Sequence, residues 1–258
     1  MEEPGPNAPD AGDVVFPAGW TVTHVAETGS TNADLLSSAA ERPDRSVLVA
    51  DHQTAGRGRL DRRWEAPPGA NLLVSLLFRD VPPTPSELTR RVALAAADAG
   101  RTLTGVEVAL KWPNDLLIDD RKLAGILAER NAAGDVVVGI GLNVGWAPDG
   151  AARLADHGPE VTPLAVLAEL LAAFDRLPAD TFGRYRAALG TLGRRVRVEL
   201  PSGVLEGTAT DVEPDGRLVV VDTCAVTHRL AAGDVVHVRP SRPERTGPIA
   251  GEGSASGP

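Results

Sequence analysis

Two apolar runs separated by a short turn constrain the fold of this chain more than any other feature of its sequence. Residues 123–130 and 135–144 are rich in Leu, Ile and Val, and Ala-Ala-Gly at 132–134 lies between them. A connection of this length joins neighbouring strands as a β-hairpin, whose two strands run antiparallel. We therefore expect at least part of the sheet to be antiparallel.

The other segments up to residue 190 alternate between strand-like and helix-like patterns. Apolar or alternating runs predict strands at 20–27, 46–50, 71–78 and 107–112. Helix starts are indicated by a capping box at Thr31-Asn32-Ala33-Asp34 and by the pairs Thr84-Pro85 and Thr162-Pro163, with a further helix at 179–189. The alternation predicts an α/β (α+β) domain with a mixed sheet, for which we expect the bounds 16–190.

After Gly193 the apolar runs become shorter and turn residues more frequent. Five strand-like runs lie at 195–200, 204–212, 217–222, 226–230 and 235–239. Short strands at this spacing predict a small β-barrel, which we place at 191–240. The ends, 1–15 and 241–258, are rich in Gly, Pro and Ser and are expected to be disordered tails.

The composition excludes several classes of protein. The chain has 26 basic and 35 acidic residues, a balance that argues against a general nucleic-acid binder. Its one cysteine, Cys224, permits no internal disulfide, and the five histidines lack the spacing of a zinc site. No apolar run is long enough to span a bilayer, and the acidic, proline-rich start is unlike a signal peptide. We expect a cytoplasmic protein that does not bind membranes.

Four arginines within seven residues are the most distinctive local feature of this acidic chain. Arg57, Arg59, Arg62 and Arg63 lie in the run 53–64, and glycines at 56 and 58 flank the first of them. Arginine donors beside a flexible backbone suit a phosphate or adenylate anion. The Walker spacing is absent, and a solvated charged turn explains the run about equally well when it is considered alone.

Three further segments place polar groups at the ends of apolar runs. Ser-Thr-Asn at 30–32 offers small donors and acceptors, although simple helix capping explains it better in isolation. Lys-Trp-Pro-Asn-Asp at 111–115 is followed by Arg-Lys-Leu-Ala-Gly-Ile-Leu at 121–127, which suits a nucleotide or magnesium, with a charged turn at 119–122 as the alternative. Glycines at 139, 141 and 145 miss the dinucleotide spacing but allow a strand to pass under a ligand beside Asn143.

Taken in this order, the segments resemble the signatures of the biotin protein ligases. They are Ser-Thr-Asn (30–32), Gln-x-x-Gly-Arg-Gly-Arg (53–59), Lys-Trp-Pro-Asn-Asp (111–115), Arg-Lys-Leu-Ala-Gly-Ile-Leu (121–127) and Gly-Leu-Asn (141–143). The resemblance covers about residues 20–240. It implies a mixed-sheet catalytic domain related to class II aminoacyl-tRNA synthetases, followed by an SH3-like barrel.

The resemblance also implies the reaction and the partners. Biotin and ATP, with Mg²⁺, would give biotinyl-5′-adenylate and pyrophosphate. A lysine of a biotin carboxyl carrier domain of an acyl-CoA carboxylase would then take the biotin from the adenylate. We expect a monomer or a weak homodimer.

By the same resemblance, individual residues receive roles. Biotin would be bound by Ser30, Thr31, Asn32, Gln53, Gly56, Arg57, Lys122 and Gly125. ATP would be bound by Arg59, Lys111, Asn114, Asp115, Lys122 and Asn143, and Asp115 would hold Mg²⁺. The catalytic charges would be Lys122, Arg57 and Arg59.

Two departures from the family pattern are visible. Asp61 stands where many relatives have a third glycine of the arginine loop, so ordering of the loop is in question. About 19 residues precede Trp20, too few for the winged helix-turn-helix that some relatives carry, so we expect no DNA binding. A lipoate or octanoate ligase and a non-enzymatic biotin sensor remain the alternative functions.

Overall fold

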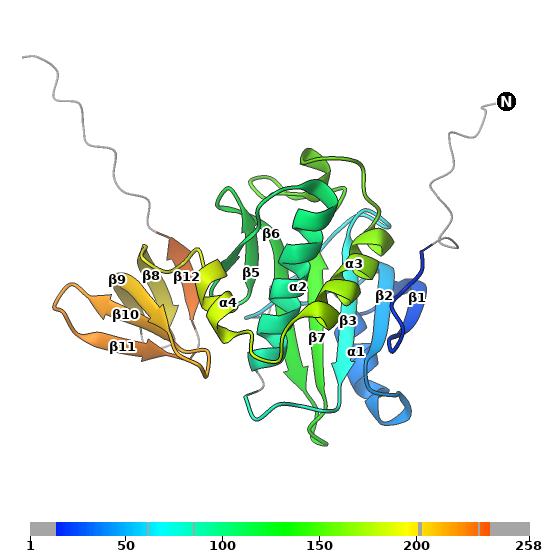
Figure 1. Ribbon diagram of the computed structural model, residues 1–258, viewed down its shortest axis with the longest axis horizontal. Helices are drawn as coiled ribbons and strands as arrows, with labels where there is room; N and C mark the ends of the chain where they lie inside the picture. Colours follow the sequence, from blue (N-terminus) through cyan, green and yellow to red (C-terminus); the bar gives the residue numbers. More distant parts are fainter. Residues whose placement is uncertain (1–13, 61, 85, 201–202, 232, 238–258) are drawn as a thin grey trace, which may run out of the picture.

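The computed structural model describes residues 14–60, 62–84, 86–200, 203–231 and 233–237. These residues form a seven-stranded sheet with helices on both faces and, after it in the chain, a five-stranded antiparallel sheet (Figure 1). The predicted fold class, a mixed α/β domain followed by a small all-β unit, is confirmed. The expected tails lie outside the described residues, except for positions 14 and 15. Asp61 also lies outside them.

The larger sheet has the strand order β1-β2-β3-β7-β6-β5-β4. Its strands are β1 (Thr21–Thr28), β2 (Ser46–Gln53), β3 (Leu72–Phe78), β4 (Ala109–Lys111), β5 (Asp115–Ile118), β6 (Arg121–Arg130) and β7 (Val136–Leu142). Strands β1 and β2 pair in parallel, whereas the other neighbours pair antiparallel. The predicted hairpin is present as β6–β7, with Ile126 opposite Ile140.

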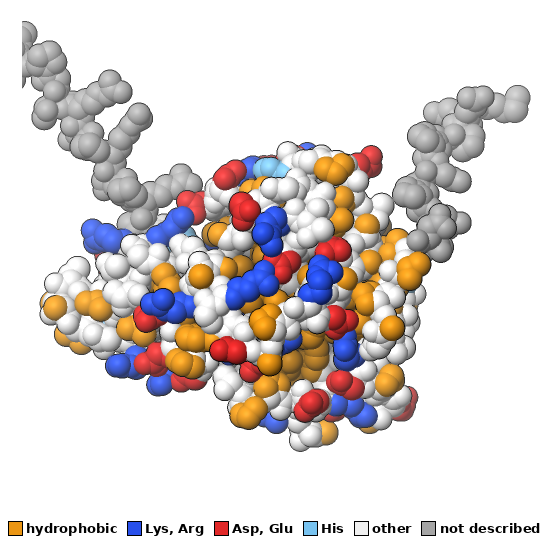
Figure 2. All heavy atoms as spheres, viewed as in Figure 1, with side chains coloured by type: hydrophobic (Ala, Val, Ile, Leu, Met, Phe, Trp, Pro, Cys, Tyr) orange, Lys and Arg blue, Asp and Glu red, His pale blue; other side chains and the backbone are white. Residues whose placement is uncertain are grey.

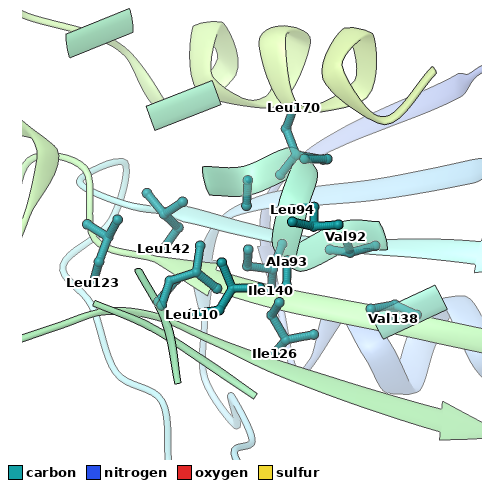
Figure 3. Close-up of a cluster of buried hydrophobic side chains, with 14 of the residues drawn as sticks. Val92, Ala93, Leu94, Leu110, Leu123, Ile126, Val138, Ile140, Leu142 and Leu170 are labelled. Carbon is teal, nitrogen blue, oxygen red and sulfur yellow. The ribbon is translucent and has the colours of Figure 1, made fainter. Parts of the chain in front are cut away.

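Two long helices, α2 (Ser86–Thr104) and α3 (Pro163–Arg176), cover one side of this sheet, which we call the α2/α3 face (Figure 1). Every second strand residue points at them, so Val138, Ile140 and Leu142 of β7 pack with Leu94 of α2 and Leu170 of α3 (Figure 3). As predicted, the Thr162 side chain caps α3 by accepting a hydrogen bond from the Ala165 amide. Acidic and basic side chains are interspersed on the outer side of these helices (Figure 2).

The opposite side of the sheet, which we call the α1 face, is covered only in part. The short helix α1 (Thr31–Ser37) packs there against β2, β3 and β7. Leu35 of α1 forms a small apolar cluster with Leu48, Leu77 and Val137. Because α1 has only seven residues, it leaves the rest of the α1 face available for a cavity.

Two short elements were not predicted as they occur. Strand β5 is not predicted from the sequence, because its four residues carry too short an apolar run to be recognised. The following Asp119 and Asp120 both have positive φ, as expected for the two-residue turn of the β5–β6 hairpin. Helix α4 (Phe182–Ala188) is shorter than the predicted 179–189, and two 3-10 helices, η2 (Ala39–Glu41) and η3 (Leu154–Asp156), complete this part of the chain.

The smaller sheet contains the five predicted C-terminal strands. They are β8 (Arg195–Leu200), β9 (Gly203–Val212), β10 (Leu218–Asp222), β11 (Thr227–Leu230) and β12 (Asp234–His237), paired in the order β11-β10-β9-β8-β12. Among the described residues β11 and β12 do not pair, so closure of this sheet into a barrel stays a prediction. The domain bounds 16–190 and 191–240 likewise stay predictions.

Three side chains of the larger domain hold the turn between β9 and β10. Arg90 Nη1 donates to the Pro214 carbonyl at 2.6 Å, and Ser86 Oγ donates to the next carbonyl, of Asp215, at 3.1 Å. Trp112 Nε1 donates to the third carbonyl, of Gly216, at 2.8 Å. These three hydrogen bonds fix the smaller sheet against the start of α2.

No helix in the described part of the chain is long and apolar enough to cross a membrane.

Candidate active site

The α1 face holds a cavity of about 250 Å³ between β3, β6, β7 and the arginine loop, residues 56–64. Most of the residues that the sequence singles out line it: Ser30, Thr31, Asn32, Gln53, Arg57, Arg59, Asn114, Asp115, Lys122, Gly125 and Asn143. Segments up to 113 positions apart in the chain (Ser30 to Asn143) therefore meet at one place. Gly56 and Lys111 do not line the cavity.

The Ser-Thr-Asn segment is built into the cavity wall and does not act as a helix cap. Ser30 occupies the N-cap position of α1, but no side chain makes a capping hydrogen bond there. The amide and the hydroxyl of Thr31 instead donate to Gln53 Oε1, at 2.8 Å and 3.1 Å. The capping interpretation of this segment, including the capping box, is therefore wrong, because the Thr31 hydroxyl bonds across the sheet edge to β2.

Asn32 lies at the centre of a buried polar network. Its Oδ1 accepts from Ser75 Oγ at 2.6 Å, and its Nδ2 donates to the Leu127 carbonyl at 3.1 Å and to Glu129 Oε2 at 2.8 Å. A Cβ at Gly139 would overlap the Asn32 amide, so this strand position needs glycine. Both hydrogens of the Asn32 side-chain amide are already donated to Leu127 and Glu129. Asn32 therefore holds its neighbours in position as well as lining the cavity.

The arginine loop folds back on itself as a small hairpin. The Gly58 amide donates to the Arg62 carbonyl at 2.6 Å, and the Trp64 amide donates to the Gly56 carbonyl at 3.1 Å. A Cβ at Gly56 would overlap the Trp64 carbonyl, which explains this glycine by close backbone approach. Gly56 thus shapes the loop from outside the cavity.

Two arginines of the loop reach different parts of the molecule. Arg57 Nη2 lies 3.0 Å from Glu129 Oε1 on β6. Arg59 Nη1 donates to Asn114 Oδ1 at 3.2 Å and to the Gly233 carbonyl of the smaller sheet at 3.3 Å. Burial lowers the pKa of Arg59, and the carboxylates of Asp234 and Asp115 oppose this shift. An arginine stays protonated at neutral pH under such a shift, so Arg59 remains a cation.

A β-bulge directs Lys122 into the cavity. Leu116 pairs with Ala124 whereas Leu117 pairs with Lys122, so Leu123 is an extra residue on β6. Such a residue changes which face the side chains point to: Leu123 is fully buried in the α2/α3 core, while Lys122 lines the cavity. There Lys122 Nζ lies 2.7 Å from Asp115 Oδ1 and 5.6 Å from the centre of the Trp64 ring.

Three residues that line or support the cavity do not belong to the predicted site residues: Trp64, Ser75 and Glu129. Trp64 fills the space over Gly141, where a Cβ would overlap its ring, and it also contacts the Gly125 position. Ser75 could have been noticed as the polar residue of the apolar run 72–78. Glu129 carries no such signal, because alternating polar residues at the end of a strand are usual.

Of the three carboxylates that line this cavity, Glu65, Asp115 and Asp234, Asp115 is the one from which the sequence predicts a magnesium ligand. Among the described residues, no three His, Cys, Asp or Glu side chains come together. Magnesium in nucleotide-dependent enzymes is commonly held by one or two carboxylates together with substrate phosphates. The residues present therefore fit a magnesium ion that arrives with a nucleotide.

The fold is that of biotin protein ligases. The structure of the biotin protein ligase from Aquifex aeolicus in complex with biotin and ATP matches with a TM-score of 0.73 at 24% identity, over 85% of this chain and 99% of that one. The biotin protein ligase from Leishmania major in complex with biotinyl-5-AMP matches with a TM-score of 0.58 at 24% identity, over 82% of this chain and 99% of that one.

Sequence comparison goes further than fold. Residues 23–145 match the Biotin/lipoate A/B protein ligase family, and residues 191–238 match the Biotin protein ligase C terminal domain. The biotin–[acetyl-CoA-carboxylase] ligase of Mycobacterium tuberculosis is 44% identical over 248 residues, which are 86% of this chain and 91% of that protein. The ligase of the same name from Paracoccus denitrificans is 37% identical over 66% of this chain and 74% of its own length. This chain belongs to the biotin protein ligase family.

Proposed function

We propose that this chain is an ATP-dependent biotin protein ligase that works in two steps at the cavity on the α1 face. In the first step the biotin carboxylate attacks the α-phosphorus of ATP, forming biotinyl-5′-adenylate and releasing pyrophosphate. In the second, the amine of a lysine on a biotin carboxyl carrier domain attacks the adenylate carbonyl and AMP leaves. The observation that carries the proposal is the meeting of four sequence segments in one cavity.

The biotin end of the cavity is assigned to Ser30, Thr31 and Gln53. All three line the cavity, and Thr31 donates to Gln53 across the edge of the sheet. Gly125 lines the same cavity and leaves space beside Trp64 and Lys122, and Asn32 holds the wall in place through Ser75 and Glu129. The ring of biotin, which carries amide-like donors and acceptors, suits such a set of small polar groups.

The reacting end is assigned to Lys122, with Arg57 and Arg59 from the loop. Negative charge accumulates on the α-phosphate and carboxylate oxygens as the adenylate forms, and fixed cations stabilise that charge. Asp115, 2.7 Å from Lys122, aligns the ammonium group and would hold Mg²⁺, which neutralises phosphate charge when it is bound. Asn114 and Asn143 would contact the nucleotide, and Lys111, outside the cavity, would do so only after local movement.

The test is transfer of biotin to a carrier. Incubation of the protein with biotin, ATP, Mg²⁺ and a purified biotin carboxyl carrier domain should label a single carrier lysine, detected by intact mass and peptide mapping. Omission of ATP is the matched control. A folded protein that labels none of several carriers would overturn the proposal.

Two related measurements would reveal the alternative functions. Tighter binding of lipoate or octanoate than of biotin in calorimetry would favour the related acyl ligases. Synthesis and retention of adenylate without transfer would favour a sensor. We place the reaction in the cytoplasm, in line with the single, unpaired cysteine, Cys224. Monomer or weak homodimer, and the absence of DNA binding, remain predictions.

A further inference from the structure

A second cavity lies between the start of α2 and the β9–β10 turn. Its volume is about 550 Å³, and polar side chains that include Arg90, Thr89 and Tyr185 line it together with apolar residues such as Trp112 and Leu127. It shares four lining residues with the cavity on the α1 face, Arg59, Asn114, Ile126 and Leu127. The two cavities therefore adjoin at the Arg59–Asn114 hydrogen bond.

The second cavity contains a buried cation whose charge is not neutralised by the protein around it. Arg90 is only 7% exposed, and among the described residues it forms no ion pair with a carboxylate. One nitrogen donates to the Pro214 carbonyl, whereas Nε is buried and has no hydrogen-bond partner within the described ranges. The guanidinium lies 5.8 Å from the ring centres of Phe182 and Tyr185. A buried charge without a counter-ion is costly, so an anion that enters here would be stabilised.

The acidic residues near the cavity are already neutralised by other arginines. Arg217 lies 2.7 Å from Asp215 and 2.9 Å from Glu213, and Arg229 lies 2.7 Å from Glu213. These two carboxylates and two arginines cancel. The remaining charge on the cavity is positive and comes from Arg90 and from Arg59, which is shared with the reaction cavity.

We propose that this second cavity is a polyphosphate site that receives the pyrophosphate released in adenylate formation. The proposal rests on the proposed function. Displacement at phosphorus is in line, so pyrophosphate departs on the side opposite the attacking carboxylate. The biotin end lies at Thr31 and Gln53, and the adjoining cavity opens beside Arg59, one of the cations assigned to the reacting end. Pyrophosphate that leaves past Arg59 would next meet Arg90.

Hydroxyl donors in the cavity add to this fit. Thr89 lines it, and so does Tyr185, whose pKa is raised to about 12 by burial, so its hydroxyl keeps its proton at neutral pH. A guanidinium together with hydroxyl donors is a usual set for phosphate oxygens.

The experiment is the reverse reaction, in which pyrophosphate and biotinyl-5′-adenylate give ATP and biotin. Arg90→Met should raise the KM for pyrophosphate about tenfold or more, as expected for loss of a charged hydrogen-bond donor. The KM values for biotin and for the carrier should stay unchanged. The matched control is Arg91→Met, because Arg91 also donates to a carbonyl, that of Pro178 at 2.8 Å, and lies over an aromatic ring, that of Phe174.

Arg90 also holds the β9–β10 turn, so folding is checked by thermal unfolding, and two milder variants follow. Arg90→Lys should give an intermediate KM for pyrophosphate, and Tyr185→Phe should raise it a few-fold. An unchanged KM in folded Arg90 variants, or an equal rise in Arg91→Met, overturns the inference. A change only in the KM for the carrier also overturns it and would indicate that an acidic carrier segment occupies the cavity. Failure of the wild-type chain to make adenylate at all would instead refute the proposed function.

Discussion

The two faces of the seven-stranded sheet are made by alternate residues of the same strands, yet they differ in almost every respect. On β7, Val138, Ile140 and Leu142 point to the α2/α3 face and are buried in an apolar core. Gly139 and Gly141, between them, point to the α1 face and leave space for Asn32 and Trp64. One strand thus contributes Val138, Ile140 and Leu142 to the core and the two glycines between them to the site.

The difference shows why the site tolerates so much polarity. The α2/α3 face buries large side chains against two long helices and provides most of the apolar burial of this domain. The α1 face buries only a small apolar cluster, so the polar network of Ser75, Asn32 and Glu129 is supported by the core on the other side. Substitutions on the two faces should therefore separate stability from activity.

The largest effect on activity is expected for Lys122→Ala. Loss of a cation that stabilises developing charge should lower the rate of adenylate formation about 10²–10³-fold. The free energy of unfolding should change little, because 41% of the Lys122 side chain is exposed. Rates are measured by pyrophosphate release in single-turnover experiments, with Arg121→Ala as the exposed neighbouring control. A normal rate in Lys122→Ala would refute its assigned role.

The opposite result is expected for Leu170→Ala on the α2/α3 face. Truncation of this fully buried leucine should lower the free energy of unfolding by about 2–5 kcal/mol. Denaturant titration measures this loss. The KM for biotin, measured where the variant is still folded, should match that of the wild type. A raised KM would mean that the two faces are coupled more strongly than their separation by the sheet implies.

Gly141→Ala tests whether the small residues of the α1 face serve the site. The new Cβ would displace the Trp64 ring, whose centre lies 5.6 Å from Lys122 Nζ. We expect adenylate formation to fall about tenfold or more, since misplacement of catalytic groups is costly, while thermal stability changes less than in Leu170→Ala. Gly183→Ala, where nothing lies within 4 Å of the added Cβ, is the control. Equal losses in both variants would contradict this explanation.

A smaller effect is expected for Glu129→Gln, which removes the charge that pairs with Arg57. The KM for biotin should rise about two- to fivefold, in keeping with the modest energy of a partly exposed ion pair. The comparison is Glu169→Gln on the α2/α3 face, where Glu169 pairs with Arg176 at 2.6 Å. A biotin KM that moves equally in both variants would show that the effect is not specific to the α1 face.

The smallest effect on activity is expected for a substitution of His237, which lines neither cavity and acts on stability. Burial, with Arg194 and Lys111 nearby, lowers the pKa of His237 to about 4. Between pH 6.5 and 4 the unfolded chain binds a proton that the folded chain does not, so this part of the stability is present above pH 6.5 and is lost on acidification. His237→Gln should flatten the pH dependence of unfolding in that range. If the free energy of unfolding of His237→Gln depends on pH as steeply as that of the wild type, the pH dependence comes from other groups.

The sequence by itself determined most of the helices and strands, and it predicted which residues would meet at the site. Apolar alternation and turn residues predicted the β6–β7 hairpin, the long helices and the five C-terminal strands, because these depend on local patterns. The five short motifs indicated the family, and all but two of the residues assigned from them, Gly56 and Lys111, line one cavity.

Only the tertiary structure decided which face each residue serves. The bulge at Leu123 turns Lys122 into the cavity, and nothing in the local pattern marks that extra residue. The Thr31 hydroxyl could have capped a helix, and its bond to Gln53 depends on the parallel pairing of β1 and β2, which brings distant segments together. The environment of Arg90 is likewise decided only by the tertiary structure. Its burial and lack of a counter-ion arise from packing against the β9–β10 turn, and packing between distant segments is not encoded in any short stretch of sequence.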